Sequence, residues 1–484
     1  MDLERLITAL GPLEVRGGAP TDITDLAYDT REVRPGALFF CAPGERIDRH
    51  DLAGEAVERG AAALVVERPL DLRVPQLVVP SARAAMAVAA DEFFGRPTEE
   101  LVVAGVTGTN GKTTTAYLLY SILDTAGMRP GLIGTIESRV GGEARPAVRT
   151  TPEAIDLQRT FREMVDAGDR SVVLEATSHG SVLGRLDRVR FDGLAFTNLT
   201  QDHLDFHGSM DEYYEAKRRL FAEHEPPPPA AVNVDDPWGK RLADELRRLN
   251  RAPLLTYGLG DDADITTSAS WGSIVTPEPI GYGGILLRAQ LHGRFNMQNM
   301  LAAVAVSRLI GIPDESVATG VERLPGVPGR FESVQEGQPF TVLVDYAHTP
   351  DSLANVLRAA RELTAGQLIC VFGCGGDRDR GKRPEMGRIA SELADIAIVT
   401  SDNPRSEDPL AIIDDILAGV SEDVQVEPDR RAAIVRAIEE AGERDVVVIA
   451  GKGHEQGQEF ADRKIPFDDR EVAREALRNL RAPA

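Results

Sequence analysis

Short apolar runs alternate with amphipathic stretches along almost the whole chain. Such alternation is typical of repeated strand–helix units, in which strands pair side by side in a mainly parallel sheet. In the first hundred residues we predict strands at 38–41, 62–66 and 76–79 and a helix over 82–94. The pattern therefore predicts an α/β fold, with each sheet mostly parallel.

The same pattern restarts twice, which divides the chain. A Gly-Arg-Pro turn follows the first helix, and a new strand over 101–106 leads into a helix over about 112–126. Turn-forming residues fill 325–330, and further strands are expected at 340–346, 368–372, 396–400 and 446–450. We predict a small α/β domain at 1–98, a central domain at 99–330 and a Rossmann-like, doubly wound domain at 331–484. A chain of 484 residues is also too long for a single core.

Composition narrows the possible partners. The chain has 77 acidic and 54 basic residues, a net charge of −23, which disfavours nucleic acids and anionic membrane surfaces. No secretion signal and no apolar run of about 18 residues is visible, so a cytoplasmic protein, which we take to be a monomer, is expected. The three cysteines, Cys41, Cys370 and Cys374, are expected to be small buried hydrophobic residues and not a disulfide framework or metal site.

The segment between the predicted strand and helix of the central domain is typical of a phosphate-binding loop. Residues 105–114 read Gly-Val-Thr-Gly-Thr-Asn-Gly-Lys-Thr-Thr. Glycines let backbone N–H groups approach phosphate oxygens, Lys112 would reach the β- and γ-phosphates, and Thr113 would hold Mg²⁺. The strict spacing fails by one residue, because Val106 stands where the leading glycine belongs. The flanking strand and helix still favour a nucleoside triphosphate over a chance turn.

Two further polar segments follow apolar strands. Glu175 ends the run 172–174 and could be a metal ligand, and residues 198–208 form a dense polar run that contains His203. Taken alone, His179 or His203 could equally be a structural residue, and the neighbouring Ser/Thr–His pair could indicate nucleophilic hydrolysis. No Gly-x-Ser-x-Gly motif supports hydrolysis.

Taken together, the motifs make the chain resemble the Mur ligase family over nearly its whole length. The segments that carry the resemblance are 108–114, 175–179, 198–208, 214–217, 295–299, 328–330, 345–348, 373–378, 402–405 and 451–455. The resemblance implies three domains that bind in turn a UDP-sugar, ATP with Mg²⁺, and an amino acid. It implies that ATP phosphorylates the terminal carboxylate of UDP-N-acetylmuramoyl-L-alanyl-D-glutamate and that the amine of meso-diaminopimelate attacks the acyl phosphate.

The resemblance also assigns roles to individual residues. Lys112, Glu175, His203 and Lys217 would be catalytic, with Thr113 and Glu175 on one Mg²⁺ and His203 on a second. Lys217 would be carbamylated (N6-carboxylysine) and face the metal; without the resemblance, it would be a surface lysine of the helix 215–219. The ATP contacts would be Gly108, Thr109, Asn110, Gly111, Lys112, Thr113, Thr114, Asn299, Arg330 and Asp345. The contacts to the UDP-sugar substrate would be Thr30, Thr150, Thr151, Thr177 and Arg185.

Four positions depart from the family pattern. Thr30 and Thr177 each stand where serine is usual, Ala176 stands where valine is usual, and Arg49 precedes His50 where glycine is common. Thr30 retains a hydroxyl, so we expect its substrate contact to survive.

By the same resemblance, Arg378, Asp402, Asn403, Arg405, Gly451 and Glu455 would bind diaminopimelate, with Arg405 gripping its distal carboxylate. The alternative for Arg405 is a cap on a helix beginning near Pro409, where a cation would oppose the dipole. Alternatives for the whole protein are an L-lysine-adding ligase, a folylpolyglutamate or cyanophycin-type synthetase, and a non-catalytic ATP-binding relative.

Overall fold

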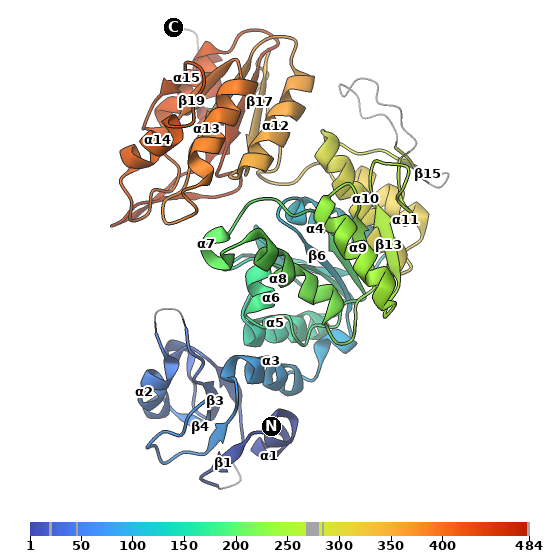
Figure 1. Ribbon diagram of the computed structural model, residues 1–484, viewed down its shortest axis with the longest axis vertical. Helices are drawn as coiled ribbons and strands as arrows, with labels where there is room; N and C mark the ends of the chain where they lie inside the picture. The colour runs from blue at the N-terminus through green and yellow to red at the C-terminus, as the bar shows by residue number, and fades with distance from the viewer. Residues whose placement is uncertain (19–21, 45–46, 268–279, 283–284, 482–484) are drawn as a thin grey trace.

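The computed structural model describes residues 1–18, 22–44, 47–267, 280–282 and 285–481. Three separate sheets follow one another along the chain, each with its own helices (Figure 1). We refer to them as the N-terminal, central and C-terminal units; in Figure 1 they lie from bottom to top. The predicted α/β class is confirmed, and the parallel sheets carry antiparallel strands only at their edges.

The N-terminal unit has a five-stranded sheet in the order β1-β5-β4-β3-β2. Its strands are β1 (Glu14–Arg16), β2 (Asp25–Ala27), β3 (Ala37–Phe40), β4 (Ala61–Val66) and β5 (Gln76–Val78). Its helices are α1 (Leu3–Leu10), α2 (Ala53–Glu58) and α3 (Ala82–Phe93), with short 3₁₀ turns η1 (Thr30–Glu32), η2 (Arg49–Leu52) and η3 (Pro97–Glu99). Every residue of β3 is buried, because apolar clusters pack on both faces of the sheet. The strands and the helix predicted here all form.

The central unit has an eight-stranded sheet in the order β13-β12-β11-β6-β10-β7-β8-β9. The strands are β6 (Val102–Thr107), β7 (Pro130–Ile133), β8 (Glu137–Val140), β9 (Glu143–Pro146), β10 (Ser171–Glu175), β11 (Gly193–Phe196), β12 (Ala230–Asn233) and β13 (Leu254–Tyr257). Its helices are α4 (Lys112–Thr125), α5 (Ala154–Asp166), α6 (Ser178–Val182), α7 (Leu204–His207), α8 (Met210–Ala222), α9 (Pro237–Leu249), α10 (Arg294–Leu309) and α11 (Asp314–Arg323). A separate hairpin joins β14 (Ile280–Tyr282) and β15 (Ile285–Leu287). Since β10, β6 and β11 are parallel neighbours, the loops after them meet at one edge of the sheet.

The C-terminal unit has a six-stranded sheet in the order β16-β17-β21-β18-β19-β20. The strands are β16 (Glu332–Val334), β17 (Thr341–Asp345), β18 (Leu368–Phe372), β19 (Ile396–Val399), β20 (Gln425–Val426) and β21 (Val446–Ala450), with a hairpin of β22 (Gly457–Glu459) and β23 (Lys464–Pro466). Its helices are α12 (Pro350–Leu363), α13 (Lys382–Leu393), α14 (Pro409–Leu417), α15 (Arg430–Glu440) and α16 (Asp469–Arg481). One apolar cluster packs α12, α13 and α14 on one face, and another packs α15 and α16 on the opposite face. This is the doubly wound arrangement that the sequence predicts.

The structure also bears on the predictions about the cysteines and about membrane-spanning segments. Cys41, Cys370 and Cys374 are free and buried, which confirms them as small core residues. Within the described ranges, no helix is both long and apolar enough to cross a membrane.

Candidate active site

The predicted phosphate loop links β6 to α4. Gly111 immediately precedes α4 with a φ of +86°, and a Cβ at this position would lie 2.2 Å from Asn299 Oδ1. Only glycine fits so strained and crowded a place. Lys112 is the first residue of α4, and its Nζ donates to the backbone carbonyls of Gly108 (2.9 Å) and Thr109 (2.8 Å). The ammonium therefore lies within the curve of the loop, where phosphate oxygens would bind.

Thr113 and Glu175 meet beneath this loop. Glu175 is the last residue of β10, beside β6, and its Oε2 accepts a 3.1 Å hydrogen bond from Thr113 Oγ1. Thr135 holds the same carboxylate through its backbone N–H (2.9 Å) and its hydroxyl (2.8 Å). Both Thr113 and Glu175 are buried. A hydroxyl and a carboxylate are the oxygen donors that Mg²⁺ prefers, so this pair fits the expected metal.

His203 lies apart from that pair. It precedes α7 in a left-handed conformation, and its Nε2 lies 3.4 Å from Asp202 Oδ2. Its ring centroid is 4.8 Å from that of His179, edge to face. Among the described residues, no group of three or more His, Cys, Asp or Glu side chains is placed to hold a metal ion. His203 and Thr113 nevertheless line the same cavity, of about 270 Å³.

Lys217 is buried inside the central unit, and the alternative of a surface lysine is wrong. It lies on α8, is 1% exposed, and donates from Nζ to the Gly108 carbonyl at 2.9 Å. The same Nζ is 4.7 Å from the centroid of the Tyr213 ring. Burial lowers the pKa of Lys217 well below its ordinary value, and the charge of Lys112 lowers it further. Its surroundings therefore favour the uncharged amine over the ammonium.

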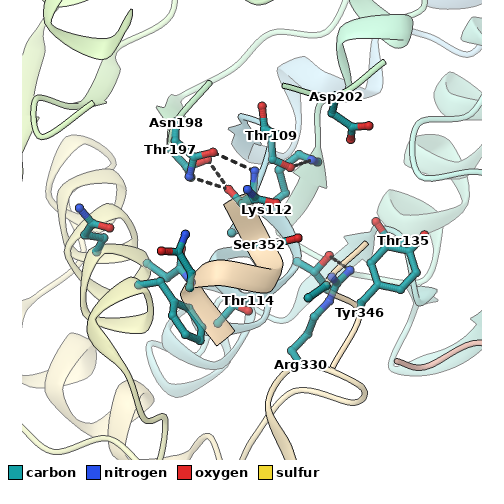
Figure 2. Close-up of a pocket in the computed structure, with 18 of the residues that line it drawn as sticks. Thr109, Lys112, Thr114, Thr135, Thr197, Asn198, Asp202, Arg330, Tyr346 and Ser352 are labelled. Atoms are coloured by element: carbon teal, nitrogen blue, oxygen red, sulfur yellow. Dashed lines mark hydrogen bonds between the residues drawn. The ribbon is translucent and has the colours of Figure 1, made fainter. Parts of the chain in front are cut away.

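The C-terminal unit and Arg330, which directly precedes it, supply the other wall of the cavity. Figure 2 shows Lys112 and Thr114 from the loop together with Arg330, Tyr346 and Ser352 around the same space. Arg330 donates from Nη2 to Thr113 Oγ1 at 3.1 Å, and its guanidinium lies over the Tyr346 ring at 4.4 Å. Its Nε is buried and has no hydrogen-bond partner among the described residues, so a donor remains for an acceptor such as a ligand oxygen.

Asp345 and Asn299 complete the predicted nucleotide contacts, and both line this cavity. Asp345 ends β17 and accepts the backbone N–H groups of Phe331 (2.6 Å) and Ala347 (2.7 Å). Burial raises the pKa of its carboxyl to about 6. Asn299 lies on α10 and donates to Asn296 Oδ1 at 3.1 Å.

The loop also bonds directly to the C-terminal unit. Asn110 donates from Nδ2 to Asp351 Oδ2 on α12 at 2.9 Å, while its carbonyl accepts the Thr197 hydroxyl at 2.6 Å. Figure 2 shows Thr197 and Asn198 reaching the loop from the strand beside it. Phosphate loop and C-terminal unit are thus in contact at the site.

Four of the five predicted UDP-sugar contacts gather beside Glu175. Thr151 donates its hydroxyl to the Glu175 carbonyl at 2.7 Å and accepts the Thr177 hydroxyl at 3.0 Å. Arg185 donates to the Thr151 carbonyl at 2.9 Å, and the hydroxyl of Thr150 lies 3.2 Å from that of Thr135. This set lies next to the atoms expected to handle the phosphate.

Thr30 is not part of that set. It is buried at the start of η1 and lines a second cavity, of about 870 Å³, between the N-terminal and central units. Arg49, the residue that departs from the family pattern, lines the same cavity, with its guanidinium 5.7 Å from the Tyr28 ring centroid. Glu153 also lines it and pairs with Arg185 at 2.8 Å, which connects the two places.

The predicted amino-acid contacts of the C-terminal unit surround a lysine that the sequence analysis did not single out. Lys452 is completely buried, and its Nζ lies 2.8 Å from Asn403 Oδ1, 3.0 Å from Glu455 Oε2 and 3.6 Å from Asp402 Oδ1. Asn403 Nδ2 also donates to Glu455 Oε2 at 2.7 Å. Gly451 directly precedes Lys452 and donates its N–H to the Asp345 carbonyl at 3.1 Å. The cluster is therefore joined to the nucleotide contacts.

Arg405 and Arg378, the two arginines predicted to bind the amino acid, have different surroundings in the structure. Arg405 donates from Nη1 to the Gly376 carbonyl at 2.7 Å, and its Nε is 3.4 Å from Glu459 Oε2. It does not cap α14, because Asp408 makes that cap by accepting the Leu410 N–H. Arg378 is exposed and, within the part of the chain that the structure describes, donates to the carbonyl of Asp377, so the structure does not bring it into the Lys452 cluster.

Sequence reasoning also missed Asp202. It is buried, lines the same cavity as Lys112 and Thr113, and lies 3.9 Å from His348 of the C-terminal unit. Burial raises the pKa of Asp202, but the neighbouring His203, His348, Lys382 and Lys112 outweigh it and hold that pKa below its ordinary value. Asp202 belongs to the polar run 198–208, and Lys452 to the segment 451–455, so both motifs were visible although these members were not chosen.

Comparison with known proteins places this site in a family. Residues 22–94 match the Mur ligase family catalytic domain, 106–307 the Mur ligase middle domain, and 329–453 the Mur ligase glutamate ligase domain. A protein of Geobacillus thermodenitrificans is 46% identical over 99% of this chain and 100% of its own length. One from Solibacter usitatus is 48% identical over 95% of this chain and 94% of its own. Both are named UDP-N-acetylmuramoyl-L-alanyl-D-glutamate–2,6-diaminopimelate ligase.

Solved structures of Mur ligases share the fold of this chain. A structure described by that same ligase name superposes with a TM-score of 0.69 at 31% identity, covering 98% of this chain and 99% of the other. MurF ligase from Thermotoga maritima in complex with ADP shares the fold, with a TM-score of 0.62 at 20% identity over 94% of this chain and 97% of that one. The matched segments cover all three units, and the chain belongs to the Mur ligase family.

Proposed function

We propose that the protein is an ATP-dependent ligase that joins meso-diaminopimelate to UDP-N-acetylmuramoyl-L-alanyl-D-glutamate in peptidoglycan precursor synthesis. The observation that carries the proposal is the cavity that the phosphate loop and Arg330 share with Asp345 and Tyr346 of the C-terminal unit, to which Gly451 joins the Lys452 cluster. The relatives named for this reaction, at 46–48% identity over at least 95% of the chain, support the choice of substrates.

In the first step, a carboxylate oxygen of the nucleotide substrate attacks the γ-phosphorus of ATP, and the bond to the ADP oxygen breaks. Two anions must approach each other, so the site has to concentrate positive charge. Lys112 inside the loop and Arg330 beside Thr113 are the cations placed to do this. Mg²⁺, which Thr113 and Glu175 would hold, supplies further charge neutralisation at the phosphates.

In the second step, the amine of the incoming amino acid attacks the acyl carbon, and phosphate leaves. Asn299 on α10, Arg330 directly before the C-terminal unit and Asp345 within it hold the nucleotide. Thr151 and Thr177 hold the sugar-peptide beside Glu175. Binding across three units brings the reactants together, which converts encounters in solution into a reaction within one complex.

We propose that the side-chain nitrogen of Lys217 carries a carbamate. As an unmodified cation it would be expensive to bury beside Lys112, and its depressed pKa favours the amine that CO₂ carbamylates. The carbamate would convert this position into an anion. With His203, it would serve the second Mg²⁺ in this proposal.

Selectivity for diaminopimelate is assigned to Arg405. The distal carboxylate distinguishes this amino acid from L-lysine, and a guanidinium can bind it through two parallel N–H···O bonds. Asn403 and Glu455, held together by Lys452, lie in the same unit and would take the polar groups at that end. We keep Asp402 and Gly451, which lie beside Lys452, as proposed contacts of the amino acid. Arg378 is also kept as a proposed contact, although it lies outside the Lys452 cluster.

We also propose the domain limits 1–98, 99–330 and 331–484, a monomer, and a cytoplasmic location. The limits fall at η3 and directly before β16, between the three sheets. The reaction requires nucleotide substrates and no nucleic acid or membrane partner.

The test is an ATP-dependent ligation assay with the UDP-dipeptide substrate and, in parallel, meso-diaminopimelate, L-lysine and L-ornithine. We expect ADP and phosphate release, and a ligated product, with meso-diaminopimelate. A preference for L-lysine would overturn the proposed specificity. No phosphate release with any amino acid would favour a non-catalytic ATP-binding protein.

A further inference from the structure

Two loops of the C-terminal unit meet at the end of its sheet. Residues 373–380 follow β18 and carry Arg378, and residues 400–408 follow β19 and carry Arg405. The Gly376 N–H donates to the Asn403 carbonyl at 2.9 Å. A Cβ at Gly376 would lie 1.9 Å from the Pro404 carbonyl oxygen, so the two backbones pack as closely as glycine allows.

Glu407 joins these loops through both of its carboxylate oxygens. Oε1 accepts the Asp377 N–H at 2.6 Å and a guanidinium N–H of Arg383 at 2.9 Å. Oε2 accepts N–H groups from Arg383 at 3.0 Å and Arg380 at 2.8 Å. One side chain of the second loop thus holds the backbone residue directly before Arg378 in the first loop.

The anchor of this contact is rigid and permanently charged. Arg383 lies on α13 with a side chain only 1% exposed, binds Glu407 in a bidentate pair, and also donates to Asp415 at 2.9 Å. Hydrogen bonds from Arg383 lower the pKa of Glu407 to about 2. The contact is therefore intact at any pH at which the protein would work.

A second, more exposed contact also links the two loops. Asp377 accepts the Ser406 hydroxyl at 2.6 Å and the Ser406 N–H at 3.2 Å. Asp377 precedes Arg378 and Ser406 follows Arg405. Each arginine is thereby flanked by a residue that is bonded to the other loop.

We infer that Glu407, anchored by Arg383, is a positioning residue that fixes the spacing between Arg378 and Arg405 and so sets the affinity for a two-ended amino acid. The inference rests on the proposed function and deepens it. Diaminopimelate carries an amino and a carboxylate group at each end, so its binding depends on two distant sets of contacts. A change in loop spacing weakens one set whenever the other is made.

The test compares Glu407→Gln with wild type and with Glu392→Gln, which breaks the exposed Arg388–Glu392 pair on α13, the helix that carries Arg383. We expect Glu407→Gln to raise the KM for meso-diaminopimelate at least tenfold while the KM values for ATP and the UDP-dipeptide stay within twofold. Glu392→Gln should change none of them. A merely structural role would instead lower the melting temperature and leave the KM of the amino acid unchanged in the folded fraction.

Asp377→Asn keeps the test decisive if Glu407→Gln does not fold. It weakens only the exposed contact to Ser406, and we expect a three- to tenfold higher KM for meso-diaminopimelate alone. An unchanged KM in every folded variant overturns the inference. A wild type that ligates L-lysine but not meso-diaminopimelate overturns the proposed function, a result distinct from an unchanged KM in the variants.

Discussion

Removing the Arg405 guanidinium is the most direct perturbation of amino-acid selectivity. Its side chain is 25% exposed, and it is already held by the Gly376 carbonyl and by Glu459, which is 41% exposed. Truncating one partner of a hydrogen-bonded charge pair costs about 2–5 kcal/mol, and this exposure places Arg405 at the lower end, about 2–3 kcal/mol. At 1.4 kcal/mol per tenfold, Arg405→Ala should lower kcat/KM for meso-diaminopimelate about 30- to 150-fold.

The assay measures kcat/KM for meso-diaminopimelate and for L-lysine with wild type, Arg405→Ala and Arg405→Lys. L-Lysine lacks the distal carboxylate, so its kcat/KM should change little, and Arg405→Lys should fall between the others because it keeps the charge and loses the planar fork. Arg463→Ala, which removes an exposed arginine paired with Asp462, is the matched control. An unchanged ratio of the two amino acids in Arg405→Ala would refute the reasoning.

Three further changes test the phosphate loop, the buried lysine and the core of the C-terminal unit. Lys112→Ala should abolish ligation while leaving UDP-substrate binding measurable by calorimetry, because the ammonium serves the transferring phosphoryl group. Lys217→Ala should be nearly inactive, and added short-chain carboxylates should restore part of the rate in the phosphate-release assay. Asp469→Asn should lower the free energy of unfolding of the C-terminal unit by about 3–5 kcal/mol in urea, because it leaves the fully buried Arg430 without its partner charge.

These three substitutions are compared with control variants, and for each of them one result would contradict the prediction. Lys240→Ala, at an exposed lysine on α9, should leave the ligation rate unchanged. Glu475→Gln breaks the exposed Arg431–Glu475 pair and should cost at most about 1 kcal/mol. Near-wild-type ligation by Lys112→Ala, full activity of Lys217→Ala without carboxylates, or equal urea midpoints for Asp469→Asn and Glu475→Gln would each contradict the corresponding prediction.

The parts of the fold that the sequence predicts best are strands buried on both faces. The predicted strands 368–372 and 446–450 coincide with β18 and β21, because continuous apolar runs mark strands covered by helices on each side. The antiparallel strands β8 and β9, at one end of the central sheet, were not predicted. Their residues are mostly half-buried or exposed, so no apolar run distinguishes them from a loop.

At the candidate site, the sequence located motifs but not all of their members. The strands β6 and β10 are parallel neighbours, so their carboxyl ends lie at the same edge of the sheet. The contact between Thr113, which follows β6, and Glu175, which ends β10, could therefore be expected. Lys452 could not be chosen, because lysines are normally exposed and only tertiary contacts bury this one among Asn403 and Glu455. The surface alternative for Lys217 failed for the same reason.

The sequence by itself determined the α/β class, the order of the three sheets and the strand–loop–helix around Gly-Lys-Thr. Each depends on residues close together in the chain, namely apolar runs, turn formers and the spacing of that motif. Tertiary structure decided which distant side chains share a cavity or a charge partner, as with Arg330 on Thr113 and Glu407 on Arg383. Such contacts depend on how helices and strands pack, and burial changes the protonation and partners of a side chain without leaving a local trace in the sequence.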